Sequence, residues 1–303
     1  MTMTASPTNP LLEKLASARE LPTIPAVLVP LLRYMEQPSD TLDIQQLVKL
    51  ISQDKSLAAR CLQMANSPLF GCSHEVETIQ SAVVALGLNR IQEIAVSCSL
   101  LRLLPAVSFG VSPSVFWAHS LACAMVAREF ASRIGFSDPA KAYAAGLLHD
   151  VGIVALLWVS PHDFRRSFEY GSSRRIPLHE AEERTLGINH SECGKIIATS
   201  WHLPTDLVEA IACHHSPAKA IGNPRLTSIV SVSDLLCRLG GLGYGYTEDK
   251  QTNFAEEPGF AILAAHYRSL HPFDLARFTF ETEGLLEEVR AVVARVYGTA
   301  QWA

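Results

Sequence analysis

The side chains best equipped for chemistry in this sequence are histidines and aspartates that recur in a fixed order. They are His119, the adjacent pair His149 and Asp150, His190, the adjacent pair His214 and His215, and Asp234. Imidazole nitrogens and carboxylate oxygens bind Zn, Fe, Ni or Mn ions in proteins, and two neighbouring ions need about six such groups. The series therefore predicts a site for one or two divalent transition-metal ions.

Asp150 provides the strongest evidence for such a site. With His149 it lies inside residues 140–159, a stretch that predicts a central helix with apolar residues on nearly all faces. A buried ionised carboxylate destabilises a fold by several kcal/mol unless it is paired or bound to a metal. We therefore expect Asp150 to face a cation or strong hydrogen-bond donors.

Each of the other candidates has a simpler explanation when it is considered alone. His119 could be a hydrogen-bonded core residue, and His214 with His215 could complement a helix dipole at a helix end. His190 could lie at the surface, and Asp234 could pair with a nearby arginine. One shared site explains all of them together better than independent coincidences. The histidines in polar, proline-flanked or peripheral contexts are interpreted as structural: His162, His179, His202, His266 and His271.

The elements that must position these side chains are predicted to be helices. Hydrophobic residues recur at helical spacing in nearly every segment, which predicts an all-α multi-helix bundle. We expect a flexible tail over residues 1–13, an N-terminal helical subdomain over 14–113, a second subdomain with the histidines over 114–240, and a C-terminal helical extension over 241–303. That extension could pack on the core or form a dimer contact, and packing is the simpler expectation.

Several helices have bounds that the pattern defines. Asn189 followed by Glu192 is an Asn variant of the capping box and predicts that a helix begins there. The other predicted helices cover residues 25–35, 43–52, 54–65, 78–86, 89–104, 114–134, 140–159, 205–214, 225–239, 258–269 and 282–297.

Composition excludes several classes of protein. The formal net charge is −5, and the tight basic pairs are limited to Arg165–Arg166 and Arg174–Arg175, which argues against nucleic-acid binding. The seven cysteines are odd in number and scattered, as expected of reduced thiols in the cytoplasm. Residues 1–10 lack a signal-peptide pattern, and the apolar run at 144–159 is too short for a membrane span. We therefore expect a cytoplasmic protein without membrane insertion.

The order His, His-Asp, His, His-His, Asp resembles the HD superfamily of helical metal-dependent phosphohydrolases. The neighbouring segments are more similar to its HDOD branch, and the resemblance covers roughly residues 15–240. The matching segments are Leu-Pro-Thr-Ile-Pro at 21–25, Ala-Asn-Ser-Pro-Leu-Phe-Gly at 65–71, Ala-Leu-Gly-Leu at 85–88, Ala-Gly-Leu-Leu-His-Asp-Val-Gly at 145–152, Glu182 with Leu-Gly-Ile-Asn-His at 186–190, Trp-His-Leu-Pro at 201–204, and the His pair at 214–215.

The resemblance assigns roles to the ordered series. It implies that the core metal ligands are His119, His149, Asp150 and Asp234. It also implies that His190, His214 and His215 match the additional ligands of HD-GYP cyclic-dinucleotide phosphodiesterases.

The sequence departs from the HD-GYP pattern where a substrate would bind. Ser216 follows the His pair in place of a glutamate, and Gly-Tyr-Gly at 243–245 lacks the proline of that family's loop. Cys237 and Arg238 stand where a phosphate-binding lysine is expected. The ligands are therefore retained while the substrate-binding pieces are absent.

Two hypotheses follow from this pattern. HDOD proteins are generally linked to bacterial signal transduction through protein partners, which implies a regulatory module whose metal is structural or sensed. The alternative is a metal-dependent phosphohydrolase that takes a nucleotide or cyclic dinucleotide as its ligand, with Arg238 offsetting the phosphate charge.

Overall fold

The computed structural model describes residues 9–17, 23–35, 43–72, 74–101, 103–105, 110–249, 253–267 and 275–297, and within these ranges the chain forms helices and loops without a β-strand. This confirms the all-α prediction. The helices are α1 (Pro10–Ser17), α2 (Leu28–Met35), α3 (Ile44–Ser52), α4 (Lys55–Ala65), α5 (Ile79–Leu86), α6 (Leu88–Leu100), α7 (Pro113–Ile134), α8 (Pro139–Leu148), α9 (Val151–Val159), α10 (Pro161–Arg174), α11 (Leu178–Leu186), α12 (His190–Ser200), α13 (Thr205–Cys213), α14 (Pro224–Leu239), α15 (Pro258–His266) and α16 (Leu275–Tyr297). Short 3₁₀ turns are η1 (Pro68–Phe70), η2 (Pro217–Lys219) and η3 (Phe254–Glu256).

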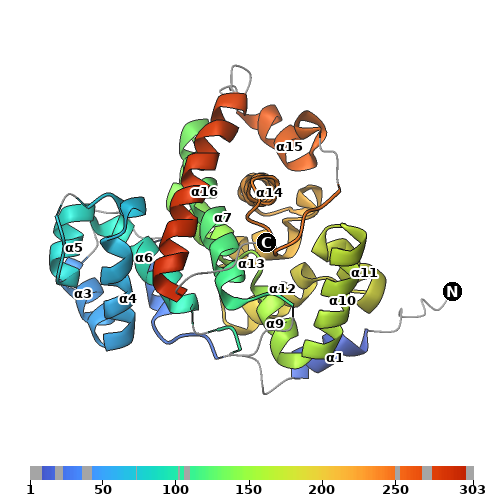
Figure 1. Cartoon of the computed structure of the whole chain (residues 1–303), viewed down its shortest axis with the longest axis horizontal. Coiled ribbons are helices and arrows are strands. Elements are labelled where there is room, and N and C mark those ends of the chain that lie inside the picture. Colours follow the sequence, from blue (N-terminus) through green and yellow to red (C-terminus); the bar gives the residue numbers. More distant parts are fainter. Residues whose placement is uncertain are drawn as a thin grey trace.

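The N-terminal half is a small helical bundle in which α3, α4 and α5 gather at one end of the molecule (Figure 1). Its helices begin at side-chain caps: Asp43 and Asp54 each accept backbone N–H bonds from the first turn of the next helix. Helix α6 is buried along most of its length because α2, α4 and α5 pack against it and α8 contacts it as well. Helix α6 therefore joins the N-terminal bundle to the second half.

The second half is built around α7, which packs along α8 and α14. Two glycines allow unusually close approach around the predicted site. A Cβ on Gly146 would lie 2.8 Å from the Cys123 carbonyl oxygen, and one on Gly152 would lie 1.8 Å from the His190 carbonyl oxygen. Only glycine fits at these positions. The segment between them, which holds His149 and Asp150, is thereby pressed between α7 and α12.

Residues 140–159 do not form the single helix that their sequence predicts. The structure has two helices, α8 and α9, with His149 and Asp150 in the turn between them. Asp150 has left the helical region at φ −100° and ψ 15°, and its carbonyl accepts the N–H of Ile153. The break turns both side chains toward one interior point. The prediction that the apolar run is too short to span a membrane is wrong on length, because residues 139–159 are long and apolar enough to cross one. Of the 18-residue segment that meets this test, however, 94% is buried inside the fold.

The C-terminal extension packs on the core, as expected. Helix α15 lies against α14, and α16 runs along α7 and reaches η1 and α4 in the N-terminal half (Figure 1). Helix α16 begins at Leu275 rather than at residue 282, and its apolar side chains Val289 and Val293 are fully buried. The extension therefore contacts both halves of the molecule.

Part of the predicted tail belongs to a helix. Residues 1–8 of that tail lie outside the described residues. His271, one of the histidines interpreted as structural, does so too. Residues 10–13, by contrast, belong to α1, which contacts α9 and α12. Asn9 donates to the Leu186 carbonyl at 2.7 Å, and Lys14 donates to the Val159 carbonyl at 2.6 Å. These hydrogen bonds explain why the segment departs from a free tail.

Candidate metal centre

The structure brings all seven residues of the ordered series into one buried cluster. Six of the side chains are buried, and His215 is slightly exposed. They come from five places in the fold: His119 from α7, His149 and Asp150 from the turn before α9, His190 from the first position of α12, His214 and His215 from the end of α13, and Asp234 from α14. The convergence is a finding, whereas the role of these residues as metal ligands stays a prediction.

Asp150 lies at the centre, with one carboxylate oxygen directed to each of two groups of imidazoles. Its Oδ2 is 2.9 Å from His149 Nε2 and 3.3 Å from His119 Nε2. Its Oδ1 is 3.0 Å from His190 Nε2 and 3.4 Å from His214 Nε2. A carboxylate in this position can bridge two neighbouring cations.

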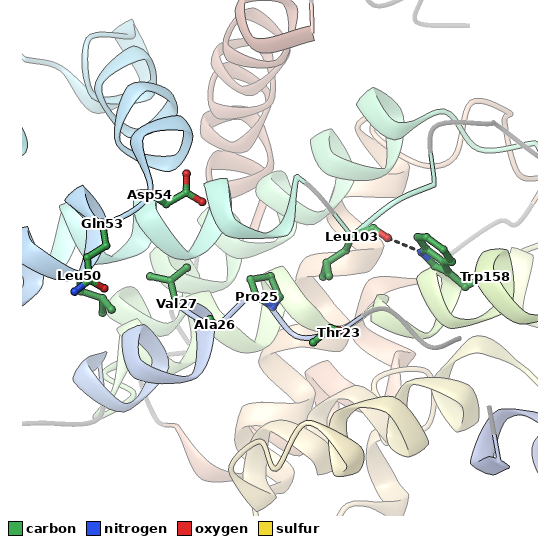
Figure 2. Close-up of a pocket in the computed structure, with 9 residues that line it drawn as sticks. All are labelled: Thr23, Pro25, Ala26, Val27, Leu50, Gln53, Asp54, Leu103 and Trp158. Atoms are coloured by element: carbon green, nitrogen blue, oxygen red, sulfur yellow. Dashed lines mark hydrogen bonds between the residues drawn. The ribbon is translucent and has the colours of Figure 1, made fainter. Parts of the chain in front are cut away.

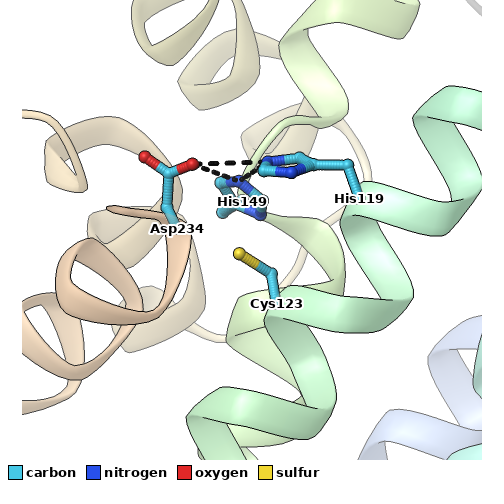
Figure 3. Close-up of side chains that lie close together, drawn as sticks. All are labelled: His119, Cys123, His149 and Asp234. Atoms are coloured by element: carbon cyan, nitrogen blue, oxygen red, sulfur yellow. Dashed lines mark hydrogen bonds and ion pairs between the residues drawn. The ribbon is translucent and has the colours of Figure 1, made fainter. Parts of the chain in front are cut away.

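The donor atoms accordingly divide into two sets. Each set offers atoms that lie within 4.8 Å of one another, as the ligands of a single ion do. The first set is His119, Cys123, His149 and Asp234, and the second is Asp150, His190, His214 and His215. Figure 3 shows the first set, with the side chains of α7, α14 and the α8–α9 turn directed toward a common point.

Hydrogen bonds fix the orientation of four imidazole rings. Nδ1 of His119 donates to the Leu242 carbonyl at 2.6 Å, and Nδ1 of His149 donates to the Gly146 carbonyl at 2.7 Å. The same atom of His214 donates to the Ile211 carbonyl at 2.9 Å. In a neutral ring this leaves the Nε2 lone pair directed into the cluster, which is the tautomer that metal-binding histidines adopt.

The fourth ring, His190, is held by a carboxylate. Glu182 is fully buried on α11, and its Oε2 accepts from the backbone N–H of His190 at 2.8 Å and from its Nδ1 at 2.6 Å. A carboxylate behind a histidine raises the basicity of the other ring nitrogen and fixes its direction. Glu182 is therefore a positioning residue of the cluster.

The interior atoms of the cluster lack good partners within the described residues. Asp150 Oδ1 and His214 Nε2 make no hydrogen bond of acceptable geometry. The Nε2 atoms of His119 and His149 are 3.2 Å apart, and those of His190 and His215 are 2.9 Å apart. Lone pairs that face each other at these distances repel unless a proton or a metal ion lies between them. The donor atoms thus fit divalent cations.

The surroundings shift the pKa values of the imidazoles in opposite directions. Burial alone would lower the pKa of His119 and His190, but facing carboxylates raise the pKa of His119 well above its usual value and that of His190 to about 10. Burial lowers the pKa of His214 and of His215, which therefore stay neutral. Metal binding would then release protons.

The two aspartates remain ionised. Burial alone would raise the pKa of Asp150, but the facing rings of His149 and His190 hold it well below its usual value. Burial opposes ionisation of Asp234 too, and Arg238 overcomes it and lowers the pKa of that carboxyl. Both side chains therefore offer negatively charged oxygens to a cation.

Arg238 closes one side of the cluster. Its Nε lies 3.0 and 3.1 Å from the two oxygens of Asp234, and its Nη1 is 2.5 Å from Glu248. Asp234 and Glu248 thus share one guanidinium. A buried carboxylate needs a paired cation, and Arg238 supplies one to both of these residues.

The wall opposite Asp150 leaves little free space. His179 stacks on His215 with ring centroids 3.8 Å apart, and Tyr244 lies 4.8 Å from the His119 ring. The cavity bounded by these residues, Arg238 and Glu248 measures about 10 Å³, which is about the space of one water molecule. This cavity is smaller than a nucleotide.

A larger hollow of about 540 Å³ lies at the junction of the two halves. Figure 2 shows its walls, including the hydrogen bond of 2.7 Å from Trp158 Nε1 to the Leu103 carbonyl. Its one carboxylate, Asp54, caps helix α4. The hollow therefore has no set of convergent catalytic groups. Its lining residues are Thr23, Pro25, Ala26, Val27, Leu50, Gln53, Asp54, Leu103 and Trp158.

Sequence reasoning did not assign a role to several residues of this cluster. His179, interpreted as structural, lines the cavity, and Glu182 was noted only within a matching segment. Cys123 and Glu248 were not considered as site residues. The spacing of Cys123 four residues after His119 could have revealed it, because residues at that spacing share a helix face. Glu248 carries no local signal.

Comparisons with known proteins found both a family model and solved structures that resemble this chain. A family model of the HDOD domain matches residues 21–217. The structure of an HDOD domain protein of unknown function from Geobacter sulfurreducens is 29% identical, with a TM-score of 0.81 and coverage of 94% of this chain and 96% of that chain.

Two further relatives define the extent of the similarity. A Shewanella amazonensis protein described as a candidate phosphohydrolase shares the fold at 22% identity, with a TM-score of 0.70 and coverage of 94% of this chain and 97% of that chain. A Treponema pallidum (strain Nichols) protein described as uncharacterized is 28% identical over 198 residues, which is 65% of this chain and 38% of that relative. The chain thus spans well under half the length of this relative.

Proposed function

This chain belongs to the HDOD domain family, and we propose that it is a cytoplasmic signal-transduction module that holds a divalent metal centre and acts through a protein partner. The observation that carries the proposal is the combination of a complete donor set with a cavity of only about 10 Å³. The donor set supports metal binding, and the small cavity supports a role that does not depend on a substrate bound beside the metal. We also retain, as part of the proposal, the predicted division of the chain into subdomains at residues 113/114 and 240/241.

Arg238 supports a non-catalytic role. We expected its guanidinium to offset phosphate charge, but it is bound to Asp234 and Glu248. Burial would lower the pKa of Arg238, and these two carboxylates raise it instead. A buried cation with two carboxylate partners stabilises the closed wall of the cluster and is not free to meet a phosphate.

Helix α9 supplies a route from the metal centre to a surface. Asp150 immediately precedes the helix, and Trp158 near its other end lines the hollow between the two halves. A helix of nine residues spans about 13 Å and transmits a shift of one end as a rigid body. We infer that metal occupancy biases the position of α9 and thereby the surface that a partner meets.

The second candidate function is metal-dependent phosphohydrolysis of a nucleotide or cyclic dinucleotide. The observation that favours it is the position of Asp150 between two imidazole sets, which suits a pair of ions. Two such ions would polarise a phosphoryl oxygen and lower the pKa of water. For a substrate to enter, the contact between Arg238 and Glu248 would have to open.

One experiment separates the two functions. The protein is purified without chelators or a metal-affinity column, its metal content is measured by elemental analysis, and cyclic dinucleotides and a generic phosphodiester are offered with added Mn²⁺ or Fe²⁺. We expect about one or two equivalents of metal and no turnover. Turnover that is lost in His149→Ala but kept in His266→Ala, an exposed control, would establish the phosphohydrolase. If the protein binds no metal even after metal ions are added to it, both functions are contradicted.

A separate measurement tests whether metal binding shifts α9. Trp158 is 40% exposed, so its fluorescence reports on the hollow. We expect metal addition to change the fluorescence of the wild-type protein and expect the change to be much smaller in Trp158→Phe. An equal change in both proteins would show that the signal arises elsewhere and that the hollow does not respond.

A further inference from the structure

Cys123 lies in the metal cluster but belongs to no motif that the proposed function uses. It follows His119 by four residues on α7, so both side chains extend from the same face of the helix one turn apart. Its side chain is fully buried, and its sulfur lies within 4.8 Å of the donor atoms of His119, His149 and Asp234. Figure 3 shows the sulfur of Cys123 next to the ring of His149, on the side toward Asp234.

The first set of donors is weak without the sulfur. An ion between His119 and His149 would receive two imidazole nitrogens and Asp150 Oδ2. Asp234 is the remaining oxygen donor, but both of its oxygens already accept from Arg238. A carboxylate shared with a guanidinium gives less charge to a metal ion. The thiol of Cys123 is the nearest additional donor.

Packing alone does not account for this placement. Buried cysteines often serve as small apolar side chains, and Cys237 on α14 is an example, since it is fully buried and contacts Cys123. Cys237 follows Asp234 by three residues, yet it is not among the grouped donor atoms. Of these two adjacent thiols, only Cys123 lies in donor range, and Cys237 provides a matched internal control.

We propose that Cys123 is a thiolate ligand of the metal held by His119 and His149. The inference rests on the proposed metal centre and narrows it: this half of the centre is a mixed nitrogen, oxygen and sulfur site. On binding, the thiol loses its proton to solvent as the metal–sulfur bond forms. Thiolates favour Zn²⁺, Fe²⁺ and Co²⁺ over the harder Mn²⁺ and Mg²⁺. The site should therefore select ions of the first group.

The test uses Co²⁺ as a coloured probe of the full-length protein. Metal-free protein is titrated with Co²⁺, and the sulfur-to-cobalt charge-transfer absorption in the near ultraviolet is recorded beside the ligand-field bands in the visible. We expect both features in the wild-type protein and in Cys237→Ser. In Cys123→Ser the near-ultraviolet absorption should disappear while the visible bands remain. The affinity for Zn²⁺ relative to Mn²⁺ should fall at least about tenfold in that variant.

The outcomes distinguish this inference from the proposed function. Visible cobalt bands without the near-ultraviolet absorption in the wild-type protein would overturn the cysteine ligand and leave the metal centre intact. If the absorption is lost in Cys237→Ser rather than in Cys123→Ser, the sulfur ligand is Cys237, and the proposal for Cys123 is overturned. No cobalt binding at all would overturn both proposals.

A second measurement needs no variant. If Cys123→Ser does not fold, X-ray absorption of the zinc-loaded wild-type protein reports the ligands directly. A sulfur shell at about 2.3 Å, beside nitrogen and oxygen at about 2.0–2.1 Å, is expected for a Cys123-bound ion. A spectrum with only the nitrogen and oxygen shell would contradict the proposal.

Discussion

Within the described residues, the N-terminal half (23–105) and the second half (110–249) bury their interiors in different ways. The first is held by apolar stripes and by caps such as Asp43 and Asp54. Its buried polar residues are few, and most of their bonds stay within α6 or reach one neighbour, as Ser97 does to Tyr143. The second half buries imidazoles and carboxylates that come from five separated segments. Most polar contacts of the first half are local, whereas the polar cluster of the second half depends on contacts between segments far apart in the chain.

The largest effect is expected from Asp150→Asn, which removes the central charge of the second half. Four imidazoles lose the carboxylate that faces them, and removal of one partner from a buried ionic cluster destabilises a fold by about 3–5 kcal/mol. Bound metal should be lost in the same variant. Denaturant unfolding and elemental analysis measure the two effects. Full metal content in Asp150→Asn would show that the carboxylate does not organise the centre.

A core substitution in the first half should destabilise the protein without changing its metal content. Leu47 is fully buried on α3, and Leu47→Ala should lower the free energy of unfolding by about 2–5 kcal/mol through a lost contact and a cavity. Metal bound per folded molecule should stay at the wild-type value. If metal content falls together with stability, then metal binding in the second half depends on the packing of the first half, which would contradict this prediction.

Smaller effects are expected from two helix caps, one in each half. Asp54 accepts N–H bonds from Ser56 and Leu57 at the start of α4, and Asn189 accepts from Ser191 and Glu192 at the start of α12. Each change to alanine should reduce stability by about 1 kcal/mol. Only Asn189→Ala should also weaken metal binding, because α12 begins at His190. Calorimetric metal titration of both variants checks this, and equal affinities would refute it.

The smallest effect is a difference in pH dependence between two glutamates. Burial raises the pKa of Glu93 on α6 despite the facing Arg128 and Arg90. Burial acts the same way on Glu209, but the N–H groups of residues 221–223 lower its pKa overall. Folded Glu93 therefore binds a proton more readily than unfolded Glu93, and folded Glu209 less readily.

The signs of the two effects are opposite. The contribution of Glu93 to stability weakens as the pH rises above the ordinary glutamate pKa of about 4.3, and Glu93→Gln should remove that loss. The contribution of Glu209 is present above that pKa and is lost as the pH falls through its lower folded value, so Glu209→Gln should reduce acid sensitivity. Denaturant midpoints across the acid range measure both. Changes of the same sign would contradict the assignment.

Local signals made much of the fold predictable. The capping box of Asn189 and Glu192 is present in the structure, and the apolar stripes in the first half form helices close to the expected bounds. The order of the histidines predicted which side chains converge. Each of these features is encoded within a few residues or within a motif of known order.

The features that sequence reasoning missed depend on distant segments. The break between α8 and α9 follows from the close approach of α7 and α12 at Gly146 and Gly152, which no local pattern reveals. The charge-rich residues of α11 resemble a solvated face, so the burial of Glu182 behind His190 was not foreseen. Periodicity describes which face of a helix is buried but not what lies across from it.

The histidine–aspartate cluster extends beyond the residues that the family model matches. The family match ends at residue 217, whereas Asp234, the Leu242 carbonyl that holds the His119 ring, and Tyr244 all follow it. A chimera that transplants only residues 21–217 would carry His119 without the carbonyl that holds its Nδ1 and without the Asp234 carboxylate that faces its Nε2. The portable unit for protein engineering is therefore longer than the domain boundary suggests, and it should include α14 together with the loop through residue 248.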